Sequence, residues 1–159
     1  MNFKKIAHRG NINGPNPKKE NHPDYLKAAL ALNYDVEVDV WVMNGKYVLG
    51  HDYPSYEVKD AFINNTGLWL HAKNLEALEK MTEGLGVFNY FWHQTDDFVI
   101  TSKGYIWTYP GKRLGPRSIC VLPERVLTDW READFSRYAG VCSDFIRSLG
   151  KYVDSPKDG

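Results

Sequence analysis

The amino-acid sequence predicts an α/β fold in which most strands run parallel. Short apolar segments of strand length, rich in Val, Ile and aromatic residues, recur along the 159 residues with turn residues between them. Two of the intervening segments place apolar residues at helical spacing. The order strand, helix, strand therefore occurs twice, and this order is typical of parallel strands joined by helical crossovers. An eightfold barrel of such units usually takes about 250 residues, so this chain can form one only with several crossover helices reduced to loops.

Nine predicted strands follow one another along the chain, and the turn Asn44-Gly45 joins the second to the third as a hairpin. They cover residues 5–8, 36–42, 47–50, 68–72, 87–92, 98–101, 105–108, 119–122 and 141–146. From about residue 93 onward, turn signals such as Tyr109-Pro110-Gly111 crowd together and interrupt the pattern.

Two helices are predicted, over residues 23–33 and 74–83. Their apolar residues recur three and four positions apart, at Leu26, Ala29 and Leu30 in the first and at Leu75, Leu78 and Met81 in the second. Asn21 and Asn74 each precede a helix and could cap it, or could equally be loop residues.

Composition indicates one globular domain over residues 1–154, followed by a frayed C-terminus at residues 155–159. Twenty basic residues balance twenty acidic ones, so no global charge attracts nucleic acid or an anionic membrane. Cys120 and Cys142 lie in apolar segments and are interpreted as small hydrophobic residues. With no signal peptide and no apolar span of about 18 residues, we expect a cytoplasmic protein without a stable membrane anchor. The sequence leaves the oligomeric state open.

The strongest local signal for chemistry is the segment Val36-Glu37-Val38-Asp39-Val40. Side chains alternate along a strand, so Glu37 and Asp39 share one face with Trp41, and the valines share the other. Two partly buried carboxylates repel each other unless a cation lies between them, and a hard divalent ion such as Mg²⁺ or Ca²⁺ suits that place. Because an isolated pair of this kind more often lies on the exposed face of a strand, the pair alone leaves both interpretations open.

Histidine and arginine residues stand at the ends of two predicted strands. His8-Arg9-Gly10 ends the first strand; arginine binds phosphate through two parallel hydrogen bonds, and histidine is a general base near neutral pH. His51-Asp52 ends the hairpin, where the imidazole is either a proton donor oriented by the acid or a capped surface histidine. His93 follows an aromatic run and is interpreted as a structural histidine at the rim of the fold.

Four elements in this order resemble the N-terminal signature of the glycerophosphodiester phosphodiesterase family. They are His8-Arg9-Gly10, Glu20-Asn21, Glu37-x-Asp39 and His51-Asp52, within residues 6–52. The family belongs to a superfamily of phosphodiesterase barrels, so the resemblance implies a compact TIM-type barrel with short crossover helices. Beyond residue 52 the resemblance is confined to residues 68–73 and to residues 140–146, whose Ser143-Asp144 is loosely similar to the family's last strand.

The resemblance implies a role for each matching residue. It makes His8 and His51 an acid/base pair, Arg9 a phosphate ligand, and Glu37 and Asp39 metal ligands. It also implies that Glu20 supports the metal site or orients the turn after the first strand. The other supporting residues are Asn21 beside Glu20, Asp52 beside His51, and Trp41, which shares a strand face with Glu37 and Asp39 and could form a wall of the site.

Two further positions complete the implied site, one on the predicted strand at residues 68–72 and one just after that strand. Lys73 matches a family lysine that adds positive charge near the phosphate. His71 stands where the family has its third metal carboxylate, and it shares a strand face with Lys73, so it is predicted to be a metal ligand or, alternatively, a hydrogen-bond donor to the phosphate. One divalent ion is expected, Mg²⁺ or Ca²⁺ by family, with Mn²⁺ or Co²⁺ preferred if His71 is a ligand.

The function implied is metal-dependent cleavage of a small phosphodiester, similar to a glycerophosphodiester, with histidines as general acid and base. In the family the nucleophile is commonly a hydroxyl of the substrate, and the cyclic phosphate so formed is then hydrolysed. Two alternatives stay open: a lyase that stops at the cyclic phosphate, and a catalytically silent phosphate- or metal-binding module on the same scaffold. Nucleic acid is not an expected partner.

Overall fold

The computed structural model describes residues 2–84 and 86–149. These residues form the predicted α/β fold, with ten strands in one sheet. The strands are β1 (Lys4–His8), β2 (Asp35–Met43), β3 (Lys46–Leu49), β4 (Tyr56–Val58), β5 (Leu68–Ala72), β6 (Asn89–Phe91), β7 (Phe98–Ile100), β8 (Ile106–Thr108), β9 (Ser118–Val121) and β10 (Gly140–Ser143). The frayed terminus predicted at residues 155–159 lies outside the described residues.

The helices lie mostly in the first half of the chain. They are α1 (Pro23–Ala31), α2 (Asp60–Ile63), α3 (Leu75–Glu83) and the 3₁₀ helices η1 (Pro123–Arg125) and η2 (Ile146–Leu149). Asn74 caps α3, because its side-chain oxygen accepts the amide of Ala77 at 3.1 Å. The cap of α1 is instead His22, which frees Asn21 for another role. No helix among the described residues is long and apolar enough to cross a membrane.

Seven strands run parallel in the order β6-β5-β2-β1-β10-β9-β8. The hairpin of β3 and β4 extends antiparallel from the second half of β2, and β7 pairs antiparallel with β8. Within the described residues this sheet is not closed, because β6 pairs only with β5. The two edges of the sheet still contact each other through Ser102, which follows β7, and Tyr90 of β6. The Ser102 amide donates to the Tyr90 carbonyl at 2.9 Å, and the Ser102 hydroxyl accepts the Tyr90 amide at 3.0 Å. The predicted abbreviated barrel is therefore not confirmed.

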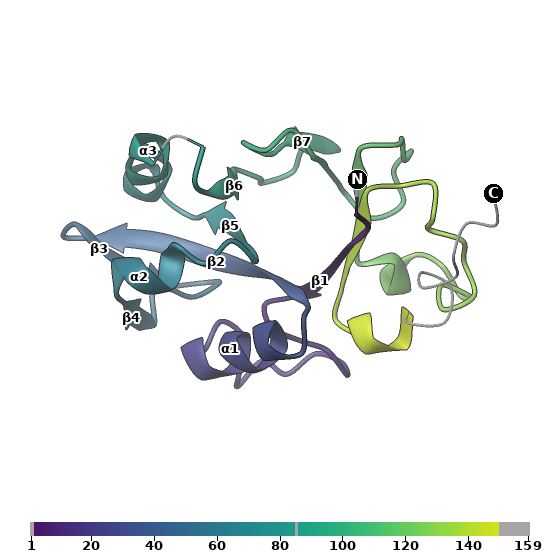
Figure 1. The fold of residues 1–159 in the computed structure, drawn as a ribbon, viewed down its shortest axis with the longest axis horizontal. Coiled ribbons are helices and arrows are strands. Elements are labelled where there is room, and N and C mark those ends of the chain that lie inside the picture. Colours follow the sequence, from purple (N-terminus) through teal and green to yellow (C-terminus); the bar gives the residue numbers. More distant parts are fainter. Residues whose placement is uncertain (1, 85, 150–159) are drawn as a thin grey trace.

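The open edge has a physical reason in the way the strands are connected. Helices α1 and α3 cross over between parallel strands, but beyond β6 the described chain connects its strands by turns and η1. A closed barrel requires every strand to be paired on both sides with a consistent tilt, and the short β6 faces an antiparallel edge strand. Figure 1 shows the consequence: the three α-helices lie on one side of β1, beside β2 to β6, and the C-terminal part of the chain lies on the other side.

One face of the sheet packs against the helices. Val36, Val38 and Val40 are fully buried on this face, in the same apolar cluster as Leu26 of α1 and Met81 of α3. The alternation predicted for β2 is thereby confirmed, since its valines point to the core and its carboxylates to the opposite face.

The opposite face is concave and surrounds a second apolar cluster. Its members include Ile6, Trp69, Phe91, Trp107 and Cys142. The rings of Phe91 on β6 and Trp107 on β8 lie 4.6 Å apart although these strands are not paired, so the sheet curls enough for its two ends to touch through side chains. This cluster occupies the amino-terminal part of the concave face, and the carboxyl ends of the strands are left for polar residues.

Candidate functional site

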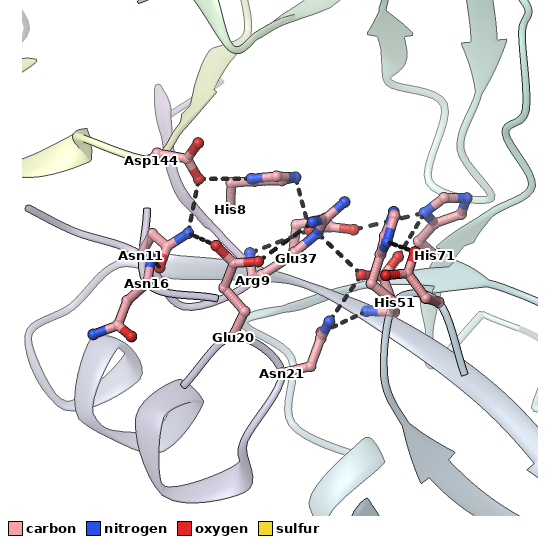
Figure 2. Close-up of polar contacts among 12 residues, drawn as sticks. His8, Arg9, Asn11, Asn16, Glu20, Asn21, Glu37, His51, His71 and Asp144 are labelled. Carbon is pink, nitrogen blue, oxygen red and sulfur yellow. Dashed lines mark hydrogen bonds and ion pairs between the residues drawn. The ribbon is translucent and has the colours of Figure 1, made fainter. Parts of the chain in front are cut away.

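The carboxyl ends of the parallel strands carry the polar side chains predicted for the site. His8 lies beside Glu37 in the strand register, and Asp39 lies beside His71. His8 follows Ile6 of the concave-face cluster by two residues, and residues two apart share a face. The four polar side chains therefore lie together on the concave face. Figure 2 shows three of them, His8, Glu37 and His71, beside one another.

A cavity of about 300 Å³ opens over this group. The predicted site residues that line it are His8, Arg9, Glu37, His51, His71 and Lys73. A second, largely apolar part of its wall includes Trp107, Tyr109 and Leu122. The structure thus brings both predicted acid/base histidines and both predicted phosphate-binding cations to one cavity.

Glu37, Asp39 and His71 form a buried group that could hold a metal ion. One ligand atom from each residue lies within 4.8 Å of the other two. Nδ1 of His71 is 3.1 Å from Oδ1 of Asp39 and 3.8 Å from Oε1 of Glu37. The Asp39 side chain is fully buried, and that of Glu37 is 3% exposed, so water does little to screen their charges.

The hydrogen bond of His71 decides which of its nitrogens can act as a ligand. Nε2 lies 2.9 Å from the carbonyl oxygen of His93. A carbonyl only accepts hydrogen bonds, so Nε2 carries a proton and, in the neutral ring, Nδ1 presents a lone pair to the two carboxylates. Metal-ligating histidines commonly donate their other ring N–H to a backbone carbonyl in this way.

The remaining partners of this group also fit a cation. Three acceptor atoms that face one another at these distances repel unless a cation, or a further proton on the imidazole, lies among them. The buried Oδ1 of Asp39 has no hydrogen-bond partner among the described residues. Two carboxylate oxygens and one imidazole nitrogen are donors suited to a divalent ion.

Burial and charge act differently on the two carboxyl groups. Burial, and next to it the charge of Asp39, raise the pKa of Glu37. Burial also opposes ionisation of Asp39, but a hydrogen bond from His71 in its protonated form and the charge of Arg9 lower the pKa of Asp39 far below its usual value. A cation bound between them would remove the penalty on ionising Glu37.

Arg9 follows β1 and has a left-handed backbone conformation, with φ of 52°. Such strain at a residue other than glycine is concentrated at functional sites. Here the turn directs the Arg9 amide to Oε2 of Glu37 at 3.2 Å. The guanidinium has Nε 3.2 Å from Oδ2 of Asp39 and Nη1 3.3 Å from Oε2 of Glu20, so Glu20 orients the arginine.

Asn21 and Lys73 complete the surroundings of Asp39. Asn21 accepts the Asp39 amide and donates to Oδ2 of the same residue, both at 2.9 Å. Nζ of Lys73 lies 3.7 Å from Oδ1 of Asp39. Asn21 therefore fixes the orientation of the carboxylate.

His8 forms a buried dyad with Asp144, which follows β10. Nδ1 of His8 lies 2.7 Å from Oδ1 of Asp144, with side chains 9% and 5% exposed. Burial lowers the pKa of His8, but the hydrogen bond to Asp144 and the charge of Glu37 outweigh it and raise that pKa. With Nδ1 bound to Asp144, Nε2 is the nitrogen left for proton transfer in the cavity.

Asn11 links this dyad to Arg9. It is fully buried, and its Nδ2 donates to Oε1 of Glu20 and to Oδ1 of Asp144, both at 2.8 Å. Figure 2 shows the resulting chain of polar contacts from Asp144 through Asn11 and Glu20 to Arg9. Movement at one end of this network is therefore opposed by hydrogen bonds at the other.

His51 lies at the mouth of the cavity. Its Nδ1 is 2.7 Å from Oδ1 of Asp52, and the two side chains are 40% and 81% exposed. Trp41 does not line the cavity; its Nε1 donates to the carbonyl of Gly50 at 2.6 Å, so it holds the turn that precedes His51. Asp52 and Trp41 both support His51.

Asp144, Asn11 and His93 contact the predicted site residues or line the cavity, although the sequence did not single them out for it. His93 lines the cavity, and its carbonyl orients His71. Asp144 is separated from His8 by most of the chain, and only the resemblance of Ser143-Asp144 to a last strand pointed to it. For Asn11, its position two residues after Arg9 was the one available signal.

Comparisons with protein-family models, curated proteins and solved structures gave no match.

Proposed function

We propose that the protein is a metal-dependent phosphodiesterase that cleaves a small, glycerophosphodiester-like substrate with histidine acid/base catalysis. The observation that carries the proposal is one cavity lined both by Glu37 and His71, which with Asp39 form the buried group suited to a metal, and by His8 of the His8–Asp144 dyad. A simple metal-binding module has little use for a histidine whose protonated form is stabilised by a buried aspartate. The order of the four N-terminal elements gives separate support, through their resemblance to the phosphodiesterase family.

The chain's own residues have distinct tasks in the proposed reaction. A divalent ion held by Glu37, Asp39 and His71 would supply positive charge to a phosphate oxygen. Arg9 and Lys73, beside the same carboxylates, would add to this charge as the phosphoryl group becomes more negative. We assign the metal to Mg²⁺ or Ca²⁺ by family, or to Mn²⁺ or Co²⁺ if the His71 nitrogen binds it.

Proton transfer falls to the two histidines. His8, at its Nε2, and His51, oriented by Asp52, would serve opposite sides of the reaction: one accepts the proton of the nucleophile and the other gives a proton to the leaving oxygen. By resemblance to the family, the nucleophile is a hydroxyl of the substrate itself. The open sheet would then be a shortened relative of the family's barrel.

A turnover assay with the p-nitrophenyl ester of glycerol 3-phosphate and added divalent ions tests the proposal, because this diester carries the neighbouring hydroxyl that the proposed nucleophile requires. We expect metal-dependent release of p-nitrophenol, and His8→Ala and His51→Ala should each reduce kcat by at least about 100-fold. His22→Ala, which alters a histidine outside this cavity, is the control and should keep its activity. Metal-stimulated binding without turnover on any diester would favour the silent module, and ³¹P NMR of the products separates a hydrolase from a lyase that releases the cyclic phosphate.

A further inference from the structure

A second cavity adjoins the proposed catalytic cavity at Arg9 and His51. Its volume is about 290 Å³, and these two residues line both cavities. A phosphodiester carries two alcohols on one phosphorus atom. This step rests on the proposed function, in which the phosphate lies beside Arg9. From that position one alcohol would extend into each cavity, so the two linings indicate the chemistry of the two alcohols.

The second cavity has a polar lining. Carboxylate, amide and hydroxyl side chains contribute to it, and of the described residues that line it only Arg9 and His51 are basic. Such groups suit a polar alcohol, because its hydroxyls both donate and accept hydrogen bonds. The lining residues that carry them are Glu20, Asn21, Asp52, Tyr53, Ser55 and Tyr56. The alcohol with the nucleophilic hydroxyl in the proposed reaction fits this cavity.

The catalytic cavity has instead an apolar wall, formed by Trp107, Tyr109, Pro110, Val121 and Leu122. Trp107 on β8 and Val121 at the end of β9 are both less than a tenth exposed. The Trp107 ring lies 4.6 Å from the Phe91 ring and 6.0 Å from the Trp69 ring, so aromatic packing holds it in place. This part of the wall belongs to the apolar cluster of the concave face, and it is formed before any ligand binds.

Leu122 has a strained backbone conformation in the apolar wall. Its φ of 47° is left-handed although leucine is a bulky residue, and it is 4% exposed. Its amide donates to the Cys142 carbonyl at 2.7 Å, which fixes the turn after β9. Glycine would adopt this conformation without strain, and such strain is concentrated at functional sites. The turn therefore keeps an apolar side chain against the cavity at a cost in backbone energy.

Tyr109 extends the apolar wall to the surface of the molecule. It follows β8 and is 47% exposed, and its ring lies 5.8 Å from the ring of His93. An apolar group bound in the cavity would cover Tyr109 as well as Leu122, and the removal of apolar surface from water would stabilise the complex.

The remaining residues of the cavity lining are His93, Gln94 and Arg125. The carbonyl of His93 orients His71, and the charge of Arg125 acts on Asp144. Gln94 is exposed to solvent. His93 and Arg125 thus act on the catalytic half of the site, and the wall itself selects for an apolar group.

We propose that the substrate joins a polar alcohol to an apolar alcohol, and that the apolar alcohol lies along the apolar wall. The polar alcohol would occupy the second cavity, and the phosphate would lie between the two beside Arg9. Tyr109 and Leu122 are then residues that determine specificity, because each shields part of the apolar alcohol from water. The substrate class is a phosphodiester between a polyol and an apolar alcohol.

The methyl, butyl and hexyl esters of glycerol 3-phosphate test the inference, because they differ only in the length of the apolar alcohol. Product formation followed by ³¹P NMR gives kcat/KM for each ester. We expect kcat/KM to rise by up to about fourfold for each methylene group that leaves water, and to level off once the chain extends beyond Tyr109. Equal values for the three esters, or a decrease with length, would overturn the inference and leave the phosphodiesterase standing.

Two tyrosines give matched variants on opposite sides of the phosphate. Tyr109 belongs to the apolar wall, whereas Tyr53 lines the second cavity and is 69% exposed. Tyr109→Ser should reduce the hexyl-to-methyl ratio of kcat/KM by about four- to fifteenfold, the effect of leaving one or two methylene groups in water. Tyr53→Ser should keep this ratio. An unchanged ratio in Tyr109→Ser, or a reduced one in Tyr53→Ser alone, would overturn the placement of the apolar alcohol.

Binding of phosphate monoesters tests the inference without turnover. Thermal shifts in the presence of the divalent ion are compared for methyl phosphate and hexyl phosphate, with wild type and both tyrosine variants. A larger shift with hexyl phosphate that only Tyr109→Ser reduces supports the apolar wall as a binding surface even if no diester is cleaved, an outcome that would overturn the proposed function alone. Absence of both turnover and a length-dependent shift would overturn both.

Discussion

Replacing Asp144 by Asn tests the role of the His8 dyad with little change in shape. Oδ1 of Asp144 accepts from Nδ1 of His8 at 2.7 Å and from Nδ2 of Asn11 at 2.8 Å. Oδ2 makes no hydrogen bond to any described residue. The amide oxygen can therefore keep both hydrogen bonds, with the amide nitrogen at the Oδ2 position, and the main loss is the negative charge.

The expected decrease in kcat of Asp144→Asn follows from the burial of His8 and Asp144. Both side chains are less than a tenth exposed. In such a place a hydrogen bond to a charged group contributes about 1.5–3 kcal/mol, and one between neutral groups contributes about 0.5–1.5 kcal/mol. The difference of about 1–2 kcal/mol corresponds to a decrease in kcat of about 5- to 30-fold, because about 1.4 kcal/mol is a factor of ten in rate.

The same variant should alter the pH dependence. Asp144 raises the pKa of His8, so its neutral replacement lowers that pKa. The limb of the kcat profile that belongs to His8 should move towards lower pH, whether His8 acts as acid or as base, because the titrating group is the same. The assay is kcat against pH for a p-nitrophenyl diester, with the melting temperature as a check on folding.

Asp52→Asn provides the matched comparison. The His51–Asp52 pair has the same 2.7 Å separation, but its side chains are 40% and 81% exposed. Exposed ion pairs contribute about 0–1 kcal/mol, so we expect at most about a fivefold decrease in kcat. If Asp144→Asn keeps wild-type kcat and an unmoved pH profile, Asp144 does not tune His8 and the dyad is structural.

The remaining predictions concern the metal group and the core. A divalent ion at a hundredfold excess over its Kd should add about 2.7 kcal/mol to the free energy of unfolding; the melting temperature should rise, and a double variant with Glu37→Gln and Asp39→Asn should lose the response. If His71 is a ligand, His71→Glu should shift the metal preference from Mn²⁺ or Co²⁺ towards Mg²⁺ or Ca²⁺; an unchanged metal profile with a raised KM would instead make His71 a phosphate ligand. Because burial raises the pKa of Cys120 to about 12 and raises that of Cys142 well above its usual value, neither thiol should react with a disulfide reagent at pH 8 until the protein unfolds, and rapid reaction in the folded state would contradict this packing.

The local pattern of the sequence determined one half of the candidate site. Strand periodicity alone placed Glu37 and Asp39 on one face of β2 and its valines on the other, and the structure confirms this arrangement. Helical spacing likewise predicted α3, and Asn74, which the sequence left open as a cap or a loop residue, caps this helix in the structure. These features depend on residues within a few positions of one another, where backbone geometry fixes the direction of each side chain.

The tertiary structure decided which distant residues meet. His8 and Asp144 come together because β1 pairs with β10, a pairing that neither strand specifies by itself. Asn21 could have been a helix cap by its position, yet it orients Asp39, since the middle of β2 lies beside it.

The local sequence pattern also could not predict whether the sheet closes into a barrel. The sequence predicted every strand of the sheet except β4, but whether β6 finds a second partner depends on the length and direction of the connections that follow it. Sequence periodicity therefore predicts which face of an element a side chain occupies, and long-range packing decides which distant residues that face contacts.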